Sequence, residues 1–203
     1  MTEPLASRPA RFTSRDLALV AVFVGIMAAL GLVPAFYPFG IAVPITAQSL
    51  GVMLAGAVLG ARRGGLSLLV FVALVAVGLP LLAGGVGGLG VFATPRVGFL
   101  LGFPPAAFTV GLITERFGPT YSLAWGLLAN IVGGIVVLYV FGIAGMMVAG
   151  HMSLDTATSV SAVFVPGDLG KAVVAAVVAR GVHSGYPGLL SARGRGETQP
   201  TAV

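Results

Sequence analysis

Long apolar runs, separated by short polar or glycine-rich breaks, constrain the fold of this chain more than any other feature of its sequence. A transmembrane helix needs about 20 mostly apolar residues. Six runs come close to or exceed that length, at about residues 17–35, 45–62, 64–83, 97–114, 121–148 and 159–179. The sequence therefore predicts an all-α polytopic membrane protein with six transmembrane helices.

The composition agrees with a membrane protein and excludes several functions. The mean hydropathy is +1.05 and only 8% of the residues are charged, too few for the solvated surface of a soluble domain. The chain has no cysteine, which excludes disulfides and thiolate metal sites, and its two histidines are too far apart to suggest a metal site. The net charge of +5 does not indicate nucleic-acid binding, because the arginines lie at the ends of the apolar runs.

The distribution of arginines predicts the orientation of the six helices. With an even number of spans, one side collects nine arginines, which are Arg8, Arg11, Arg15, Arg62, Arg63, Arg116, Arg180, Arg193 and Arg195. The other side has Arg96 alone. Cytoplasmic loops are rich in Lys and Arg, so we expect both termini in the cytoplasm of a multi-pass cell-membrane protein. Residues 1–15 then form a polar cytoplasmic segment, residues 16–182 a single transmembrane substrate-binding domain, and residues 183–203 a disordered polar cytoplasmic tail.

Two charged residues lie inside the last apolar run. Asp168 and Lys171, the only lysine of the chain, are three residues apart and share one helical face. One charge near the bilayer centre costs about 2.5–3.5 kcal/mol on insertion scales, so a pair there needs a reason. A structural ion pair that fixes helix packing is one interpretation. The sequence favours the other, in which the pair faces a polar cavity and meets a charged ligand.

Further polar or flexible features would lie on the outer side in this orientation. Gln48, the glycine-rich segment 84–90 and Arg96 would gather there, with Asp168 roughly 15 Å below the outer face. These features predict a pocket that opens to the outside. Asn130, near mid-membrane, is interpreted equally as a helix–helix contact or a ligand contact.

Two other patterns concern the packing of helices. Ala21, Gly25 and Ala29 recur every four residues and allow the close approach of another helix, either in this chain or in another subunit. Pro104 and Pro105 remove two backbone donors, so we expect them to kink or split the fourth helix.

Several linked motifs resemble those of the BioY family of biotin transporters. They are AVPITAQSLGVMLAG at residues 42–56, GARRG at 60–64, GLP at 78–80, AGGVGGLGV at 83–91, GFLLGFP at 98–104 and PGDLGK at 166–171. The resemblance covers about residues 17–179, with the motifs in the same order. One departure is Pro95-Arg96-Val97-Gly98-Phe99, where the family pattern has Pro-Thr-Gly-Gly-Tyr, so this chain gains a guanidinium at the rim of the pocket.

This resemblance implies a fold, a role and partners. Proteins of the BioY family are six-helix S components of energy-coupling-factor (ECF) transporters, which bind biotin from outside and usually pair with a transmembrane T protein and two ABC-type ATPases. The resemblance implies that Asp168 and Lys171 lie near the biotin carboxylate. It also implies that Ala21, Gly25 and Ala29 contact the T protein. Biotin is then the transported ligand, and no cofactor or metal is expected.

The chemistry of biotin suggests further contacts. Lys171 supplies charge for the carboxylate, with Arg96 as the alternative. The candidates for the ureido ring are Gln48, Asn130 and the backbone amides of the glycine-rich segment, at Gly85 and Gly88, while apolar helix faces suit the body of the ligand.

Other functions remain to be compared with this one. The motifs of membrane enzymes are lacking, so we expect no enzyme activity. The sequence contains no Walker motif, so ATP coupling would need partner chains. A self-contained carrier for biotin or another small carboxylate vitamin, without ATPase partners, is the alternative function.

Overall fold

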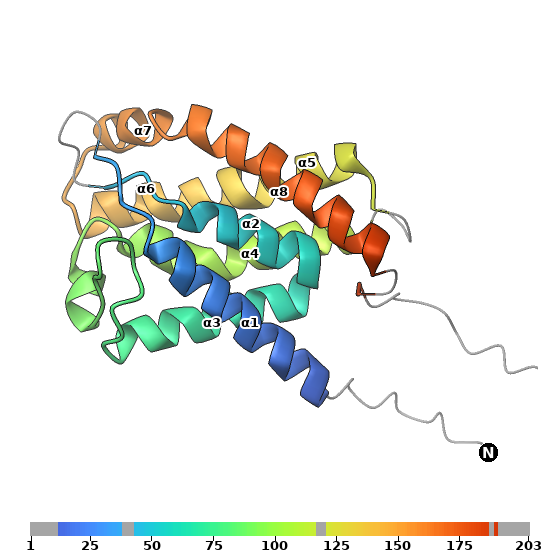
Figure 1. Ribbon diagram of the computed structural model, residues 1–203. Helices are drawn as coiled ribbons and strands as arrows, with labels where there is room; N and C mark the ends of the chain where they lie inside the picture. The colour runs from blue at the N-terminus through green and yellow to red at the C-terminus, as the bar shows by residue number, and fades with distance from the viewer. Residues whose placement is uncertain (1–11, 38–42, 117–120, 187–188, 191–203) are drawn as a thin grey trace, which may run out of the picture.

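The computed structural model describes residues 12–37, 43–116, 121–186 and 189–190, and all the regular elements in these ranges are helical (Figure 1). The elements are α1 (Ser14–Gly31), α2 (Gln48–Leu59), α3 (Ala61–Ala76), a 3-10 turn η2 (Leu89–Ala93), α4 (Val97–Arg116), α5 (Leu123–Ile131), a π-helical segment η3 (Val132–Val137), α6 (Leu138–Val148), α7 (Leu154–Ala162) and α8 (Val165–Gly185). The prediction of an all-helical fold is confirmed.

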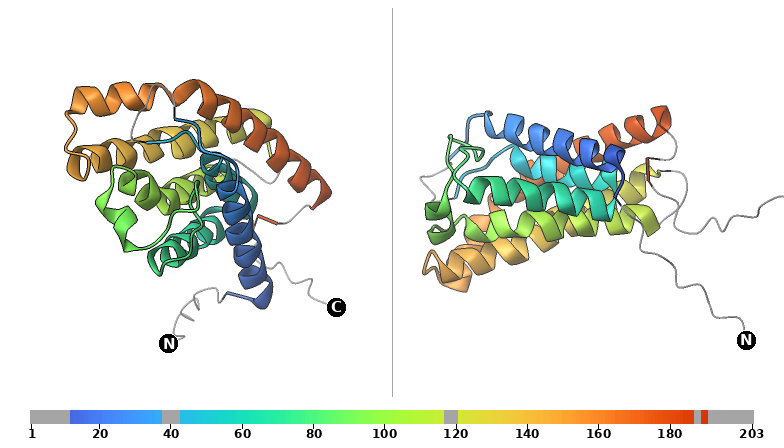
Figure 2. Two further views of the ribbon diagram at one scale, coloured as in Figure 1. Left: turned by 60° about the vertical axis from the view of Figure 1, so that its left-hand side comes forward. Right: turned by 90° about the horizontal axis from the view of Figure 1, so that it is seen from below.

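Helix α2 lies inside the bundle and brings its neighbours together. It contacts α1, α3, α4 and α8, and α1 and α8 lie on either side of it (Figures 1 and 2). Ten of its twelve residues are buried, all except Leu50 and Leu54. A Cβ on Gly56 would lie 2.4 Å from the Ala107 carbonyl oxygen of α4, so the two backbones approach as closely as small residues allow.

The lengths of the helices do not confirm six membrane spans. In the described ranges, three helical stretches are long and apolar enough to cross a bilayer: Ser14–Gly31, Val97–Arg116 and Leu123–Val148. The pair α7 and α8 makes a fourth if the two bent helices count as one span. Helix α2 has 12 residues and α3 has 16, or roughly 18 and 24 Å of rise, less than a bilayer core of about 30 Å.

The turn between α2 and α3 falls earlier than the sequence suggested. We expected the second helix to end at Arg62–Arg63, but it ends at Leu59 and α3 begins at Ala61. Gly60 makes the turn with a φ of 82°, a conformation that glycine adopts without strain. Glu115 of α4 accepts a hydrogen bond from the Ala61 amide at 2.8 Å, which satisfies one of the free donors at the start of α3.

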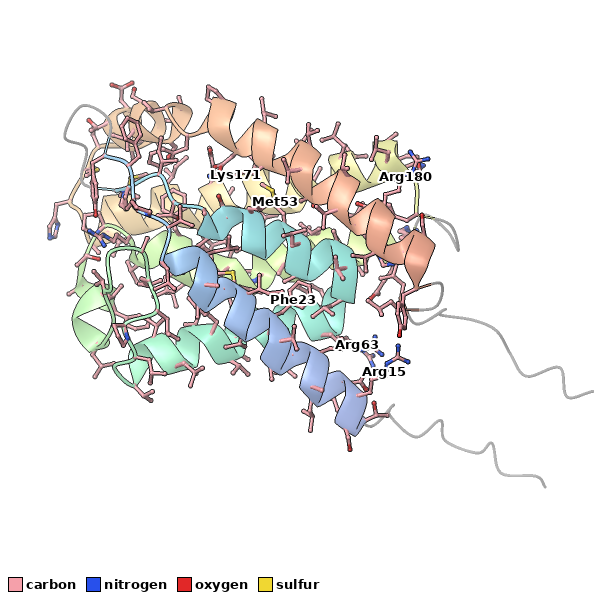
Figure 3. The ribbon with its side chains drawn as sticks, in the orientation of Figure 1. Arg15, Phe23, Met53, Arg63, Lys171 and Arg180 are labelled. Atoms are coloured by element: carbon pink, nitrogen blue, oxygen red, sulfur yellow. The ribbon has the colours of Figure 1, made fainter. Side chains whose placement is uncertain are left out.

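Arg63, in the first turn of α3, stabilises the same end of the bundle. Its Nε forms an ion pair of 2.7 Å with Asp16 of α1, and its guanidinium donates to the Leu189 carbonyl oxygen at 2.8 Å. Figure 3 shows Arg15, Arg63 and Arg180 at this end, with Lys171 nearer the other end. The start of α1 and the end of α8 also lie here, and α8 extends to Gly185, three residues into the predicted tail (Figure 1). Residues 1–11 and 191–203, which make up most of the two predicted terminal segments, lie outside the described ranges.

The fourth predicted helix has the expected position but is not split. Helix α4 continues through Pro104 and Pro105 from Val97 to Arg116. Proline is tolerated inside a buried membrane helix because neighbouring helices and hydroxyl side chains satisfy the backbone. Here α2, α3 and α6 pack around the helix.

The last two predicted helices have features that the sequence did not reveal. Residues 123–148 form one continuous stretch, as expected, but η3 interrupts its α-helical geometry. The last run is divided into α7 and α8, which meet at an angle of 51°. Pro166 lies in the first turn of α8, where proline is well tolerated. The break therefore puts Asp168 in the first turn of a helix.

Candidate ligand-binding site

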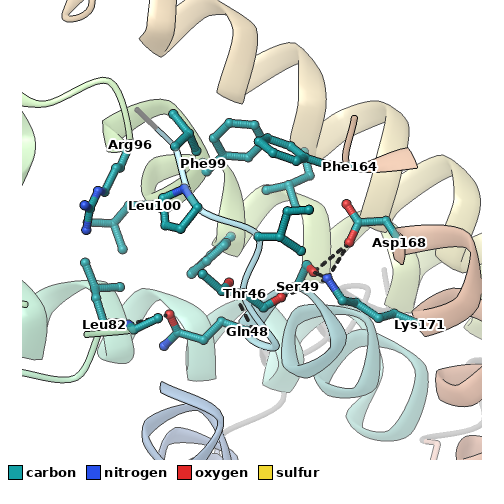
Figure 4. A pocket seen from close by; sticks show the side chains of 16 residues that line it. Thr46, Gln48, Ser49, Leu82, Arg96, Phe99, Leu100, Phe164, Asp168 and Lys171 are labelled. Carbon is teal, nitrogen blue, oxygen red and sulfur yellow. Dashed lines mark hydrogen bonds and ion pairs between the residues drawn. The ribbon is translucent and has the colours of Figure 1, made fainter. Parts of the chain in front are cut away.

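A pocket opens at the end of the bundle opposite Arg15, Arg63 and Arg180 (Figure 3). Figure 4 shows the side chains that line this pocket. About 670 Å³ of space, part of it open to solvent, lies between its walls. Its wall has 16 residues: Val43, Pro44, Ile45, Thr46, Gln48, Ser49, Leu82, Ala83, Arg96, Phe99, Leu100, Phe103, Leu138, Phe164, Asp168 and Lys171. We call these residues the pocket wall.

Lys171 and Asp168 form an ion pair within this wall. Lys171 Nζ lies 2.8 Å from Asp168 Oδ1 and also donates to the Thr46 carbonyl oxygen at 2.8 Å and to Ser49 Oγ at 2.9 Å. These three bonds use all three donors of the ammonium. The pair thus joins α8 to the start of α2, as the interpretation of a structural ion pair expects, and it also borders the pocket.

Asp168 is the most enclosed charge of the pocket wall. It is 4% exposed, and Ser49 Oγ donates to its Oδ1 at 2.9 Å. Tyr139, which is not part of the pocket wall, donates its hydroxyl to Oδ2 at 2.8 Å. The position of Asp168 in the first turn of α8 adds the favourable field of a helix N-terminus.

Gln48 belongs to the pocket wall, but both the nitrogen and the oxygen of its side-chain amide form hydrogen bonds within the protein. Nε2 donates to the Met27 carbonyl oxygen at 3.2 Å and to the Leu81 carbonyl oxygen at 3.0 Å, and Oε1 accepts from the Ala83 amide at 3.3 Å. This fully buried side chain therefore holds α1, α2 and the segment after α3 together. Its contribution to a ligand site is to position that segment.

Arg96 is the second cation of the pocket wall. It stands on the opposite side of the pocket from Lys171 (Figure 4) and donates to the Tyr37 hydroxyl at 3.2 Å. Among the described residues, no carboxylate lies within ion-pair distance of its guanidinium. Arg96 thus brings an uncompensated positive charge and several free donors to the rim.

Three predicted ligand contacts lie outside the pocket wall. Asn130 is fully buried and donates to the Ala172 carbonyl oxygen at 3.0 Å, so it joins α5 to α8. Gly85 and Gly88 have φ values of 68° and 86°, but their amides donate to the carbonyl oxygens of Leu82 and Val75. The glycines shape the segment that carries Leu82 and Ala83 into the wall.

Sequence reasoning named four of the 16 residues of the pocket wall and missed the others, of which Ser49, Phe99 and Phe164 matter most, together with Tyr139 behind the wall. Ser49 and Tyr139 complete the hydrogen bonding of Asp168, and Phe99 and Phe164 are aromatic parts of the wall. Phe99 packs edge-to-face against Tyr139 and Phe164, with ring centroids 6.1 and 6.0 Å apart. The position of Ser49 beside Gln48 in an apolar helix was the only available signal.

The small residues of α1 face away from the bundle. Ala21, Gly25 and Ala29 are all exposed, and a Cβ on Gly25 would meet no atom within 4 Å. Within the described part of the chain, no second helix packs on this stripe. The interpretation in which the stripe meets another subunit therefore fits its position better.

These features define a class of protein, a multi-pass helical membrane protein with a pocket inside its bundle that is lined by both apolar and charged side chains. The sequence profile of the BioY family matches residues 4–188. The chain belongs to the BioY family, and the resemblance seen in its motifs is confirmed.

Individual relatives agree with this assignment. A biotin transporter BioY of Rhodobacter capsulatus is 50% identical over 190 residues, covering 89% of this chain and 99% of that protein. A biotin transporter BioY of Rhizobium etli is 49% identical over 187 residues, with the same coverage. Among solved structures, the S component for biotin of an ECF-type ABC transporter superposes with a TM-score of 0.80 and 28% identity, covering 86% of this chain and 95% of that one. The helical fold is thus that of an S component.

Proposed function

We propose that this chain captures biotin at the outer face of the cell membrane, as the substrate-binding S component of an ECF-type ABC transporter. The observation that carries the proposal is the pocket inside the apolar bundle, which has a buried ion pair on one side and an uncompensated arginine on the other. Its apolar wall suits the body of biotin, and its two charged sides suit the two polar ends. The role is transport and not catalysis, as the names of the relatives indicate.

The six-span topology is part of this proposal. Helices α2 and α3 run along the bundle beside the longer helices (Figure 1), so each would cross as a short span joined to the next at Gly60. The arginines at the ends of α1 and α8 favour a cytoplasmic position for both termini. The pocket, at the other end of the bundle, would then face outward.

The orientation of biotin depends on which cation takes its carboxylate. The sequence prediction gives this role to Lys171, but all three donors of Lys171 are already used and its charge is balanced by Asp168. Arg96 has free donors left, and no carboxylate among the described residues balances its charge. The hydrogen bonding of the two cations therefore favours Arg96 for the carboxylate of biotin. Asp168, which Lys171 and Ser49 hold in place, is then the acceptor for the N–H groups of the ureido ring.

Binding and transport can be tested separately. We expect the purified full chain to bind tritiated biotin by itself, and a chain that binds none would contradict the proposal. Uptake into vesicles should require a T component and ATPase subunits. Uptake by the chain alone would instead support the alternative of a self-contained carrier.

A further inference from the structure

Tyr139 is a buried polar group that has no direct access to the pocket. Its side chain is 9% exposed, and it is absent from the pocket wall. Its hydroxyl donates to Asp168 Oδ2 at 2.8 Å, the one oxygen of Asp168 that Lys171 and Ser49 do not contact. Any effect of this hydroxyl on a ligand must therefore pass through Asp168.

Among the described residues, Asp168 Oδ2 accepts a side-chain hydrogen bond from Tyr139 alone. Oδ1 has two partners, Lys171 and Ser49, both of which belong to the pocket wall. Tyr139 fixes the rotation of the carboxylate from the side away from the pocket. With Oδ2 held, Oδ1 stays within reach of Lys171, and the ammonium stays at the edge of the pocket.

The ring of Tyr139 supports a second part of the wall. It meets Phe99 edge-to-face, with ring centroids 6.1 Å apart and an interplanar angle of 81°. A change from tyrosine to phenylalanine keeps this aromatic contact and removes only the hydroxyl. The hydrogen bond can thus be tested without disturbing the packing.

The π-helical segment η3 explains how Tyr139 reaches Asp168. A π-turn contains one residue more than an α-helical turn, so it rotates the following residues by about 100° around the helix axis. Tyr139 lies two residues after η3 (Val132–Val137). Gly133 and Gly134 let η3 pack closely, since a Cβ on Gly134 would lie 2.4 Å from Met53 Cγ of α2.

We propose that Tyr139 is a positioning residue for ligand binding, which sets the affinity by orienting the Asp168–Lys171 pair and makes no contact with the ligand. This inference rests on the proposed function, because biotin is the probe of the pair. It assigns a role to a residue outside the pocket, on a helix that contributes only Leu138 to the pocket wall.

The test is a double-mutant cycle on the full-length chain purified in detergent, with tritiated biotin as ligand. The four proteins are the wild type, Tyr139→Phe, Asp168→Asn and the double variant. Tyr139→Phe should weaken binding by about 3- to 10-fold, the effect expected if much of one hydrogen bond to a charged group is lost. In the Asp168→Asn background, where the charge is absent, the same change should cost less than about twofold.

Tyr121→Phe is the matched control. The Tyr121 hydroxyl is also buried, but it has no hydrogen-bond partner among the described residues and lies outside the pocket wall. Its removal should leave biotin binding unchanged. A general sensitivity to the loss of a buried hydroxyl would instead weaken both phenylalanine variants.

Each other outcome contradicts the inference. An equal loss in both Asp168 backgrounds would mean that Tyr139 acts independently of Asp168, and no loss would mean that it does not act on the ligand. A Tyr139→Phe chain that does not fold would assign the hydroxyl to the fold alone. A wild type that binds no biotin would overturn the proposed function itself, and this role with it.

Discussion

The sequence predicted the positions of the charged residues better than those of the hydroxyl groups. Asp168, Lys171 and Arg96 all reach the pocket wall, because a charge among apolar residues needs a polar environment and few such places exist. Hydroxyl groups give no such signal, since serine and tyrosine are tolerated on any helix face. The sequence therefore did not reveal that Ser49 and Tyr139 hold Asp168. Asn130 joins two helices, which was one of its two predicted roles.

The assignment of the two cations leads to a prediction at this scale. Biotin methyl ester has the same shape as biotin but no charge, so only the residue that binds the carboxylate should distinguish the two. Arg96→Ala should weaken biotin binding by roughly 10-fold or more and change ester binding little, because a hydrogen bond to a charged group contributes about 1.5–3 kcal/mol. Lys171→Ala should weaken both ligands by similar factors. The measurement is equilibrium binding of both ligands to three proteins at one pH.

The opposite pattern would restore the first assignment. If Lys171→Ala loses the preference for the acid and Arg96→Ala keeps it, the carboxylate lies on Lys171. Arg96 would then serve the rim of the pocket through its bond to Tyr37.

At the scale of the elements, two of the long runs were predicted well and the breaks were not. The run at 121–148 forms a continuous helical stretch from Leu123 to Val148, and the run at 97–114 forms α4. The boundary between α2 and α3 was wrong because Gly60 turns the chain before the arginines. The bend between α7 and α8 was missed because the residues at the break, Val163 and Phe164, are as apolar as their neighbours. Tertiary packing decides such positions, and composition does not reveal them.

The exposed stripe on α1 predicts the site of a partner helix. Gly25→Leu fills open space on the isolated chain, so biotin binding should stay within about twofold of the wild type. In the assembled transporter the larger side chain should prevent close helix contact and reduce co-purification of the T component. Val22→Leu, a change at an exposed position next to the stripe, is the control. A loss of biotin binding with an intact assembly would show that the stripe belongs to internal packing.

At the scale of the whole molecule, the motifs and their order predicted the family correctly. Six linked motifs in order are far more specific than one, and they require no knowledge of how the helices pack. The number of spans was harder, because two of the six runs form helices shorter than a bilayer.

The orientation of the molecule can be tested directly, because the chain contains no cysteine. Single cysteines at Leu89 and at Arg62 would mark the two ends of the bundle, and both positions are exposed. In intact cells we expect a membrane-impermeant thiol reagent to label Leu89→Cys and not Arg62→Cys. Permeabilised cells should allow both to react, which controls for access. The reverse pattern in intact cells would contradict the outward-facing pocket.

Because of the π-helical segment, the direction in which Tyr139 points depends on the number of residues that precede it in this helix. Tyr139 lies nine positions after Asn130. The two residues contact α8 from opposite sides of η3. Substitutions within η3 leave this count intact, whereas the deletion of one residue would restore a regular α-helix and turn Tyr139 by about 100° away from Asp168. Gly133 and Gly134 must stay small, because an added Cβ would meet Val110 or Met53. At the exposed Val136, the helix should therefore tolerate a change of residue type far better than a change in its length.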